Sequence, residues 1–250
     1  MSTRAKSLRR RRKPSVLARL RVFWVFILIA LFALGYGAYA LVRAPQLRVH
    51  EIIVTVDGHT VTEHDVLKAA RIDPNANAWL LDTHAIEQRV AAIPYVASVR
   101  LTRTPPADVD IAVTERVPSH CVQTRTGAYT LDDKARVLQT GCARSTLVRI
   151  DAPHAIIAAL GSSPEDSVVV GLLAAAKALD HAKLHVRSLA RDRYGDLVAT
   201  DATGVELRLG ADTDLAKKAA LVGPVRAATR NRPIRVIDLR APETPTVEFR

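Results

Sequence analysis

The feature that most constrains this chain is a stretch of twenty-one residues without a charged side chain, residues 22–42, with an arginine directly on each side. As an α-helix this stretch would be about 30 Å long, which matches the hydrocarbon core of a bilayer. No other segment approaches eighteen consecutive apolar residues. The sequence therefore predicts a single transmembrane helix over residues 22–42.

The residues before this stretch carry most of the net charge. Residues 1–21 contain nine lysines and arginines and no acidic residue, so they contribute +9 to the net charge of +11. Nucleic-acid-binding domains usually carry their basic surface on the folded part, which is nearly neutral here, so no nucleic-acid partner is expected. A basic flank on one side predicts a cytoplasmic tail at residues 1–21 and export of residues 43–250. A contact between the tail and DNA or anionic lipid is the alternative.

The apolar stretch also has a second interpretation. Ala38-Tyr39-Ala40 matches the small-residue pattern of a signal-peptidase site, so cleavage after Ala40 is the alternative to a retained anchor. The stretch before this site is longer than the apolar region of a usual signal peptide, and the basic lead is also long. These two properties favour a retained anchor.

Cys121 and Cys142 are the only cysteines. An oxidising compartment would allow them to form a disulfide, provided that the fold brings their Cα atoms within about 7 Å. Two free thiols are the alternative. No Cys-x-x-Cys motif is present, so a redox catalyst is not expected.

After the apolar stretch, the hydrophobic pattern predicts five elements in about seventy residues. Alternating apolar residues at 49–56 indicate a strand, and two short helices follow, with Thr62 and Asp82 as their N-caps. Residues 96–102 and 109–115 alternate again, and Pro105-Pro106 between them suits a connection. The order β-α-α-β-β predicts a small sheet with two helices packed on one face.

This order behind a single anchor resembles a POTRA domain, and its motifs resemble the FtsQ/DivIB family of bacterial division proteins. The family patterns are V-x-G, P-x-V-x-S-V-x-V-x-R-x-x-P and I-x-V-x-E-R-x-P. The matching positions are Val56, Gly58, Pro94, Val96, Ser98, Val99, Arg103, Pro106, Ile111, Val113, Glu115, Arg116 and Pro118. The resemblance implies a POTRA domain at residues 47–116.

Glu115, Arg116 and Pro118 mark the predicted domain junction. Pro118 ends the last strand and favours an extended conformation at the residue before it. Glu115 and Arg116 point to opposite sides of the strand, so one of them can pair across the junction. A spacer role is expected, with direct partner contact as the alternative.

Residues 117–250 are expected to form a mainly β domain with two helices. The helices are predicted at residues 168–184 and at residues 215–229, the second interrupted at Gly223-Pro224. Residues 129–138 resemble a hairpin of the family, with Ala135 where glycine is usual. V-x-L-x-L-G…K and I-D-L-R also match, at residues 205–210 with Lys217 or Lys218 and at residues 237–240. The predicted fold class is α+β: one transmembrane helix, a POTRA domain and an FtsQ-type β domain.

No catalytic, cofactor-binding or metal-binding residues are expected. The eight histidines are scattered, and only His181 and His185 have helical i, i+4 spacing, whereas zinc usually takes three or four ligands. No Gly-x-Ser-x-Gly elbow and no phosphate-binding loop is present. The sequence therefore favours a protein that is not an enzyme.

The resemblance implies a division scaffold at the septum, in the cytoplasmic membrane, that binds the bitopic proteins FtsB and FtsL and so regulates septal peptidoglycan synthesis. Strand addition to a sheet edge is the expected mechanism, with the edge at residues 234–239 and 247–249. Other division proteins are expected to bind the POTRA domain. A POTRA component of a transport or assembly apparatus is the alternative function. The candidate partner-binding residues are Val236, Asp238, Leu239, Arg240, Val247 and Phe249.

Overall fold

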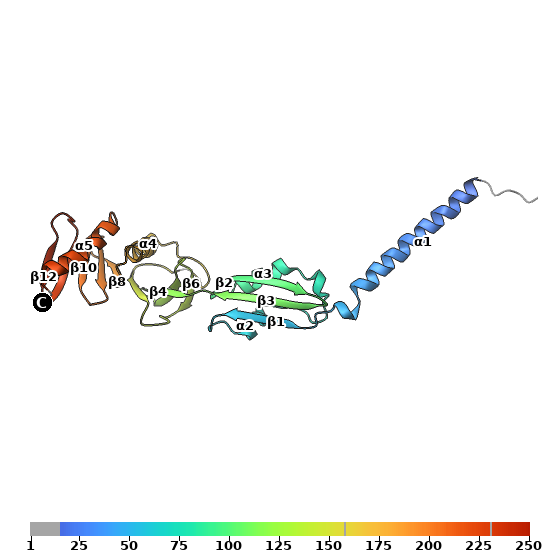
Figure 1. The fold of residues 1–250 in the computed structure, drawn as a ribbon, viewed down its shortest axis with the longest axis horizontal. Coiled ribbons are helices and arrows are strands. Elements are labelled where there is room, and N and C mark those ends of the chain that lie inside the picture. The colour runs from blue at the N-terminus through green and yellow to red at the C-terminus, as the bar shows by residue number, and fades with distance from the viewer. Residues whose placement is uncertain (1–15, 158, 231) are drawn as a thin grey trace, which may run out of the picture. The chain divides into compact units, whose positions relative to one another are not determined.

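The computed structural model describes residues 16–157, 159–230 and 232–250 (Figure 1). Most of the predicted cytoplasmic tail, residues 1–15, lies outside the described residues. The chain divides into two compact units. One unit contains the chain through Ile53 together with Ile72–Leu81 and Thr102–Asp110, and the other contains Val54–Arg71, Asp82–Leu101 and Ile111–Arg250.

Helix α1 (Val16–Val42) contains the stretch that the sequence predicts to be a transmembrane helix. Large apolar side chains along it are exposed, among them Phe32 at 77% and Leu34 at 73%. Among the described residues, no helix has the combined length and hydrophobicity needed to cross a membrane.

In the first unit, the short helices η1 (Pro45–Leu47) and η2 (Ala78–Leu80) lie on either side of a bridge between Arg48 and Asn77. The Trp79 indole donates to the Pro106 carbonyl at 3.0 Å. Arg103 donates to the carbonyls of Trp79, at 3.1 Å, and Leu81. These bonds join η2 to Arg103 and to the connection that contains Pro105 and Pro106, which lies between two strands as predicted.

The predicted order β-α-α-β-β is confirmed. It consists of β1 (Ile52–Asp57), α2 (Glu63–Ala70), α3 (Thr83–Ala91), β2 (Val96–Thr104) and β3 (Asp108–Glu115). The strands form a three-stranded sheet in the order β1-β3-β2. Both predicted N-caps are present: Thr62 forms a capping box with Asp65, and Asp82 accepts from the Ala85 N–H at 3.0 Å.

The remainder of the chain builds one nine-stranded sheet in the order β12-β11-β10-β9-β8-β7-β4-β5-β6 (Figure 1). The pairs β4–β7, β7–β8 and β10–β11 are parallel, and the other neighbours are antiparallel. The strands are β4 (Pro118–Gln123), β5 (Ala128–Asp132), β6 (Val137–Thr140), β7 (Val148–Asp151), β8 (Val186–Arg191), β9 (Leu197–Asp201), β10 (Glu206–Gly210), β11 (Ile234–Asp238) and β12 (Thr246–Phe249).

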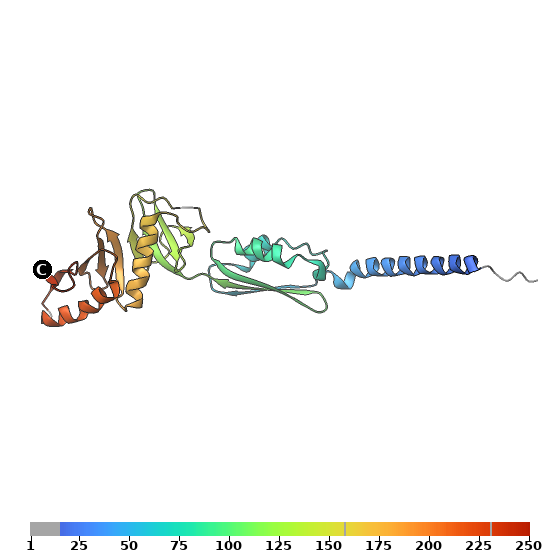
Figure 2. The same cartoon turned by 90° about the horizontal axis from the view of Figure 1, so that it is seen from above.

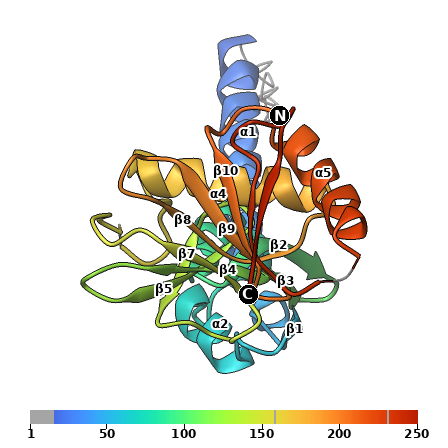
Figure 3. The same cartoon turned by 90° about the vertical axis from the view of Figure 1, so that its left-hand side faces the viewer.

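Helices α4 (Ser167–His181) and α5 (Leu215–Ala228) pack against each other, and α4 also contacts β7 and β8 (Figures 2 and 3). Beneath the helices, one cross-strand row of apolar residues runs from β4 to β12. The row is Val122, Ile150, Leu189, Ala199, Leu207, Ile237 and Val247. The helices and this row share one hydrophobic core.

Helix α5 differs from the prediction because it is not interrupted at Gly223-Pro224: the helix continues through Pro224 to Ala228. A proline inside a helix removes one hydrogen bond and costs about 3 kcal/mol. Leu215, Ala219 and Val222 are buried along α5. Burial of these residues in the core outweighs the local cost of the proline. The local sequence pattern shows the proline but not this tertiary burial, so it predicts an interruption.

The turn between β5 and β6 places Ala135 at φ 64°, in the left-handed region, with the Ala135 N–H donating to the Asp132 carbonyl at 3.2 Å. Because glycine adopts this conformation without strain, we expect Ala135→Gly to raise the free energy of unfolding by about 0.5–1 kcal/mol. Urea unfolding followed by circular dichroism would measure the change. Ala202→Gly, at an exposed position without a positive φ, should give no gain. Equal effects of the two variants would contradict the explanation.

Candidate functional site

The C-terminal strand β12 is one outer edge of the nine-stranded sheet. It pairs antiparallel with β11 through Asp238↔Thr246, Ile237↔Val247 and Val236↔Glu248. On its other side, β11 pairs in parallel with β10, so β11 is an interior strand. Of the two segments predicted as the edge, only residues 247–249 therefore lie at it.

The six candidate partner-binding residues have different environments. Val236 and Leu239 are 1% and 0% exposed, so their side chains contact the interior of the domain. Val247 is half-buried against the core. Phe249 is 36% exposed, and the Arg232 guanidinium lies 3.8 Å from the centroid of its ring. The edge therefore presents the backbone of β12 and the side chain of Phe249.

Asp238 and Arg240 form an ion pair next to this edge, with the Arg240 Nη2 2.6 Å from the Asp238 Oδ2. Burial would raise the pKa of Asp238, but the hydrogen bonds from Arg240 outweigh it and hold the pKa of this carboxyl below its usual value. The Asp238 carboxylate also accepts from the Arg240 backbone N–H at 3.0 Å. The pair therefore fixes the chain as it leaves β11.

The hydrogen bonds of β12 indicate which of its backbone groups are open. The Arg250 N–H donates to the Pro233 carbonyl at 2.9 Å, toward β11. Because the direction of N–H groups alternates along a strand, the N–H groups of Val247 and Phe249 point to the open side. Unpaired N–H and C=O groups in a row can template a further strand.

At the predicted junction, Glu115 closes the turn after β1. Its carboxylate accepts from the backbone N–H groups of His59, Thr60 and Val61 at 3.1, 2.8 and 2.5 Å. A Cβ at Gly58 would lie 2.2 Å from the Glu115 carboxyl carbon. The V-x-G and E-R-x-P motifs thus meet in one contact, which explains why a glycine and a glutamate stand at these positions.

Arg116 joins β2 to the β5–β6 turn. Its Nε donates to the Val96 carbonyl at 2.9 Å, and its Nη1 lies 2.6 Å from the Asp132 Oδ2. The Arg116 side chain is 14% exposed and the Asp132 side chain 2% exposed. The other Asp132 oxygen accepts from the N–H groups of Lys134 and Arg136. Strand β3 ends at Glu115, and Pro118 begins β4, so Arg116 lies in the two-residue link.

A disulfide joins Cys121 and Cys142, with 5.4 Å between their Cα atoms. Cys121 lies on β4, and Cys142 lies just after β6. These two strands are not neighbours in the sheet, because β5 lies between them. The bond therefore holds the segment after β6 over strand β4.

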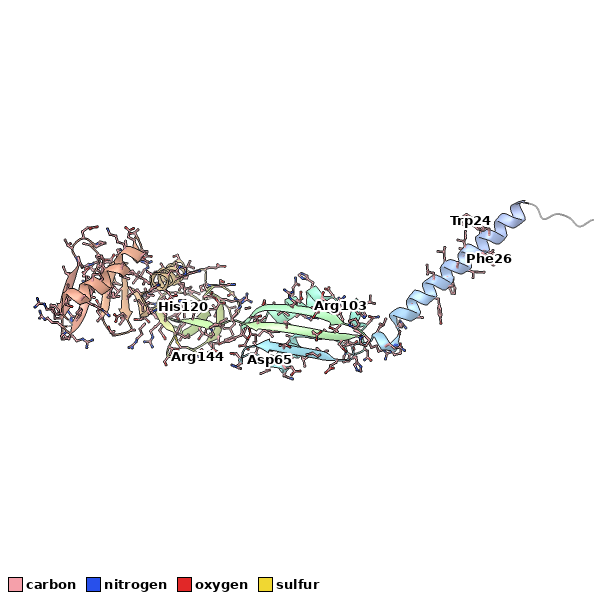
Figure 4. All side chains as sticks on the ribbon, in the orientation of Figure 1. Trp24, Phe26, Asp65, Arg103, His120 and Arg144 are labelled. Carbon is pink, nitrogen blue, oxygen red and sulfur yellow. A yellow bond between two sulfur atoms is a disulfide. The ribbon has the colours of Figure 1, made fainter. Side chains whose placement is uncertain are left out.

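One arrangement of reactive side chains was not foreseen from the sequence. The Ser119 Oγ lies 2.6 Å from the His120 Nδ1, beside a cavity of about 390 Å³ (His120 is labelled in Figure 4). Burial lowers the pKa of the His120 imidazole. The ring also bonds the backbone of Asp132, whereas a catalytic triad uses a carboxylate to orient the histidine. Within the described residues, no group of three or more His, Cys, Asp or Glu side chains is placed to hold a metal ion.

Comparison with known proteins finds relatives of both the POTRA domain and the rest of the chain. Residues 47–116 match the family model of the FtsQ-type POTRA domain. The chain is 27% identical to the cell division protein FtsQ of Mycobacteroides abscessus over 231 residues, which is 92% of this chain and 70% of that protein. It is 29% identical to cell division protein FtsQ of Mycobacterium leprae over 234 residues, covering 90% and 62% of the two chains.

A similar match is found with FtsQ of Corynebacterium glutamicum, at 29% identity over 157 residues, covering 62% of this chain and 65% of that protein. The matches to the mycobacterial proteins extend well beyond the POTRA domain, and all of these relatives are cell division proteins named FtsQ. Together with the FtsQ-type POTRA domain, these relatives show that the chain is similar to FtsQ cell division proteins over most of its length.

Proposed function

We propose that this chain is a membrane-anchored division scaffold, without enzymatic activity, that binds small bitopic division proteins of the FtsB and FtsL type at the β12 edge. Binding would occur in the exported compartment at the septum and would regulate septal peptidoglycan synthesis. The POTRA domain at residues 47–116 would bind other division proteins. The open edge of β12 is the observation that carries the proposal.

The β12 edge suits strand addition for three reasons. Its backbone offers the N–H groups of Val247 and Phe249 to a partner strand. Phe249 gives an aromatic contact within reach of that strand, and aromatic side chains often anchor interfaces. The Arg235–Glu248 ion pair adds a polar rim next to the ladder.

Helix α1 is the proposed anchor. Between Phe23 and Phe32, eight aromatic or large aliphatic side chains are each more than half exposed to solvent. A soluble monomer rarely exposes an apolar surface of this size, whereas a bilayer would cover it. The arginines at positions 21 and 43 bound the stretch, and a basic flank before it favours a cytoplasmic N-terminus.

The test is a binding titration of the full-length chain, in a neutral detergent, against the exported segments of the FtsB- and FtsL-type proteins of the same cell. We expect Val247→Pro to abolish binding, because proline removes an N–H from the open side of β12 and leaves the bonds to β11. Val247→Thr keeps the N–H and the side-chain shape and should bind like the wild type. Fluorescence anisotropy of a labelled partner segment would measure the affinity.

A chain ending at Arg240 provides the second comparison. It lacks β12 and should bind weakly, although it opens the edge of β11. If Val247→Pro and the truncated chain both bind like the wild type, the partner uses another surface and the strand-addition mechanism is wrong. Absence of wild-type binding at roughly tens of micromolar would contradict the scaffold proposal itself.

A further inference from the structure

The face of the nine-stranded sheet opposite α4 and α5 contains a polar cavity over the parallel strands β4, β7 and β8. The register of these strands places Cys121, Arg149 and Ser188 side by side. Their neighbours along each strand, Val122, Ile150 and Leu189, belong to the hydrophobic core. Because successive side chains alternate between faces, the first three residues lie on the face without helices.

The disulfide places the segment between β6 and β7 at one side of this cavity. Cys142 is bonded to Cys121, which holds the segment between β6 and β7 over β4. This segment carries Arg144, labelled in Figure 4, and Ser145. Both residues line the same cavity as Arg149 and Ser188, and the cavity has a volume of about 450 Å³.

The cavity concentrates positive charge. Three arginines line it, Arg144, Arg149 and Arg187, and all three are exposed. Among the described residues, Asp151 is the one carboxylate in its lining, and it follows Arg149 by two residues on the same face of β7. Arg187 lies where the β8–β9 register shifts, which brings it beside Ser188.

These arginines differ from the others on the same face of the sheet. Arg208, Arg235 and Arg240 each form an ion pair with a carboxylate. Among the described residues, no carboxylate oxygen lies within 4.0 Å of a side-chain nitrogen of the three cavity arginines. Arg187 donates only to the Ala202 carbonyl, at 3.3 Å. The cavity therefore holds three arginines against one carboxylate, and none of these four side chains is in an ion pair with a described residue.

We infer that this cavity binds a small ligand that carries a phosphate group. Guanidinium groups form paired hydrogen bonds with phosphate oxygens, and serine hydroxyls donate to the same oxygens. Ser145 and Ser188 supply hydroxyls on two sides of the three arginines. The volume of about 450 Å³ is within the range of small-molecule sites and leaves room for a second phosphate or an attached group.

The inference is independent of the proposed partner binding. The cavity lies on β4, β7 and β8, whereas the proposed partner edge is β12, four strands from β8 in the order of the sheet. A variant that loses one ligand can therefore keep the other. Failure of one proposal leaves the other in place.

The test is isothermal titration calorimetry of the full-length chain, in a neutral detergent at fixed ionic strength, with sodium pyrophosphate as the probe. We expect saturable binding with one site per chain. Arg149→Gln and Arg187→Gln should each weaken it about ten-fold, because each removes one charge-assisted contact. Asp151→Asn should instead tighten it several-fold, since it removes the one negative charge from the lining.

Arg125→Gln is the matched control. Arg125 is exposed in the same domain, lies outside the cavity and makes the same change in net charge. Unchanged binding in this variant would support a specific site. An equal loss in Arg125→Gln and Arg149→Gln would indicate general attraction to a basic protein and overturn the inference, as would the absence of saturable wild-type binding.

Two further probes define the ligand. Citrate carries carboxylates in place of phosphate, so tighter binding of citrate than of pyrophosphate would overturn the assignment to phosphate. Glycerol 3-phosphate represents a lipid headgroup without its acyl chains. Tighter binding of glycerol 3-phosphate than of pyrophosphate would support a headgroup source, and the reverse order would support a soluble diphosphate.

Discussion

Arg116→Met is expected to lower the free energy of unfolding by about 3 kcal/mol, because it leaves the buried Asp132 carboxylate without its cation. The Asp132 side chain is 2% exposed, so water cannot replace the guanidinium. The variant also removes the donor to the Val96 carbonyl. Urea unfolding of the full-length chain in a neutral detergent, followed by circular dichroism, would measure the loss.

A second substitution separates the charge effect from lost packing. Asp132→Asn, added to Arg116→Met, removes the unpaired charge, and the Asn side-chain oxygen can still accept from the N–H groups of Lys134 and Arg136. We expect the double variant to recover part of the lost stability. A double variant that is less stable than Arg116→Met alone would show that the carboxylate is not the source of the loss.

Arg125→Met is the control for Arg116→Met. Arg125 is exposed and forms no ion pair with a described residue, so its replacement should change the free energy of unfolding by less than about 0.5 kcal/mol. Hydrogen exchange would locate the effect of Arg116→Met. Faster exchange should be confined to β5, β6 and the start of β2, where the arginine makes its contacts.

The parts of the fold that depend on local signals could be predicted from the sequence. The N-caps at Thr62 and Asp82 bond to residues three positions along the chain, so each signal lies within one turn. In the strands before and after Pro105-Pro106, the alternation of apolar and polar residues indicates which side chains are buried. The helical conformation of residues 22–42 is likewise signalled by one contiguous stretch, which lies within α1.

Features that depend on distant pairing could not be predicted. The sequence offered residues 234–239 as an edge, but β11 pairs in parallel with β10 after a crossover through α5, and only β12 remains open. The contact between Gly58 and Glu115 joins positions that are 57 residues apart. The three-arginine cavity requires the register of β4, β7 and β8 and one disulfide at once. None of these relations has a periodic signature in the chain.

The contact at Gly58 gives the second large effect: Gly58→Ala is expected to lower the free energy of unfolding by about 3 kcal/mol. Gly58 has φ +153°, which L side chains rarely adopt, and its Cβ would displace the Glu115 carboxylate. Displacement breaks the bonds from the N–H groups of His59, Thr60 and Val61. Urea unfolding of the full-length chain would again measure the loss.

Gly127→Ala separates backbone strain from the clash. Gly127 has a nearly identical φ of +156°, but a Cβ there would meet no atom within 4 Å. This variant should therefore lose only the strain contribution of about 1 kcal/mol. If Gly58→Ala costs no more than Gly127→Ala, the carboxylate moves aside without loss, and the contact does not explain the glycine.

A double-mutant cycle with Glu115→Ala then measures the contact itself. Once the carboxylate is absent, an alanine at position 58 has nothing to displace, so Gly58→Ala should cost only about 1 kcal/mol in that background. The coupling energy of about 2 kcal/mol would be the contribution of the three hydrogen bonds that Glu115 accepts. Additive effects would mean that the glycine and the glutamate are needed for separate reasons. Strong coupling would mean that the two motifs act together. The V-x-G motif after β1 and the E-R-x-P motif at the domain junction would then jointly hold the turn after β1 against the end of β3.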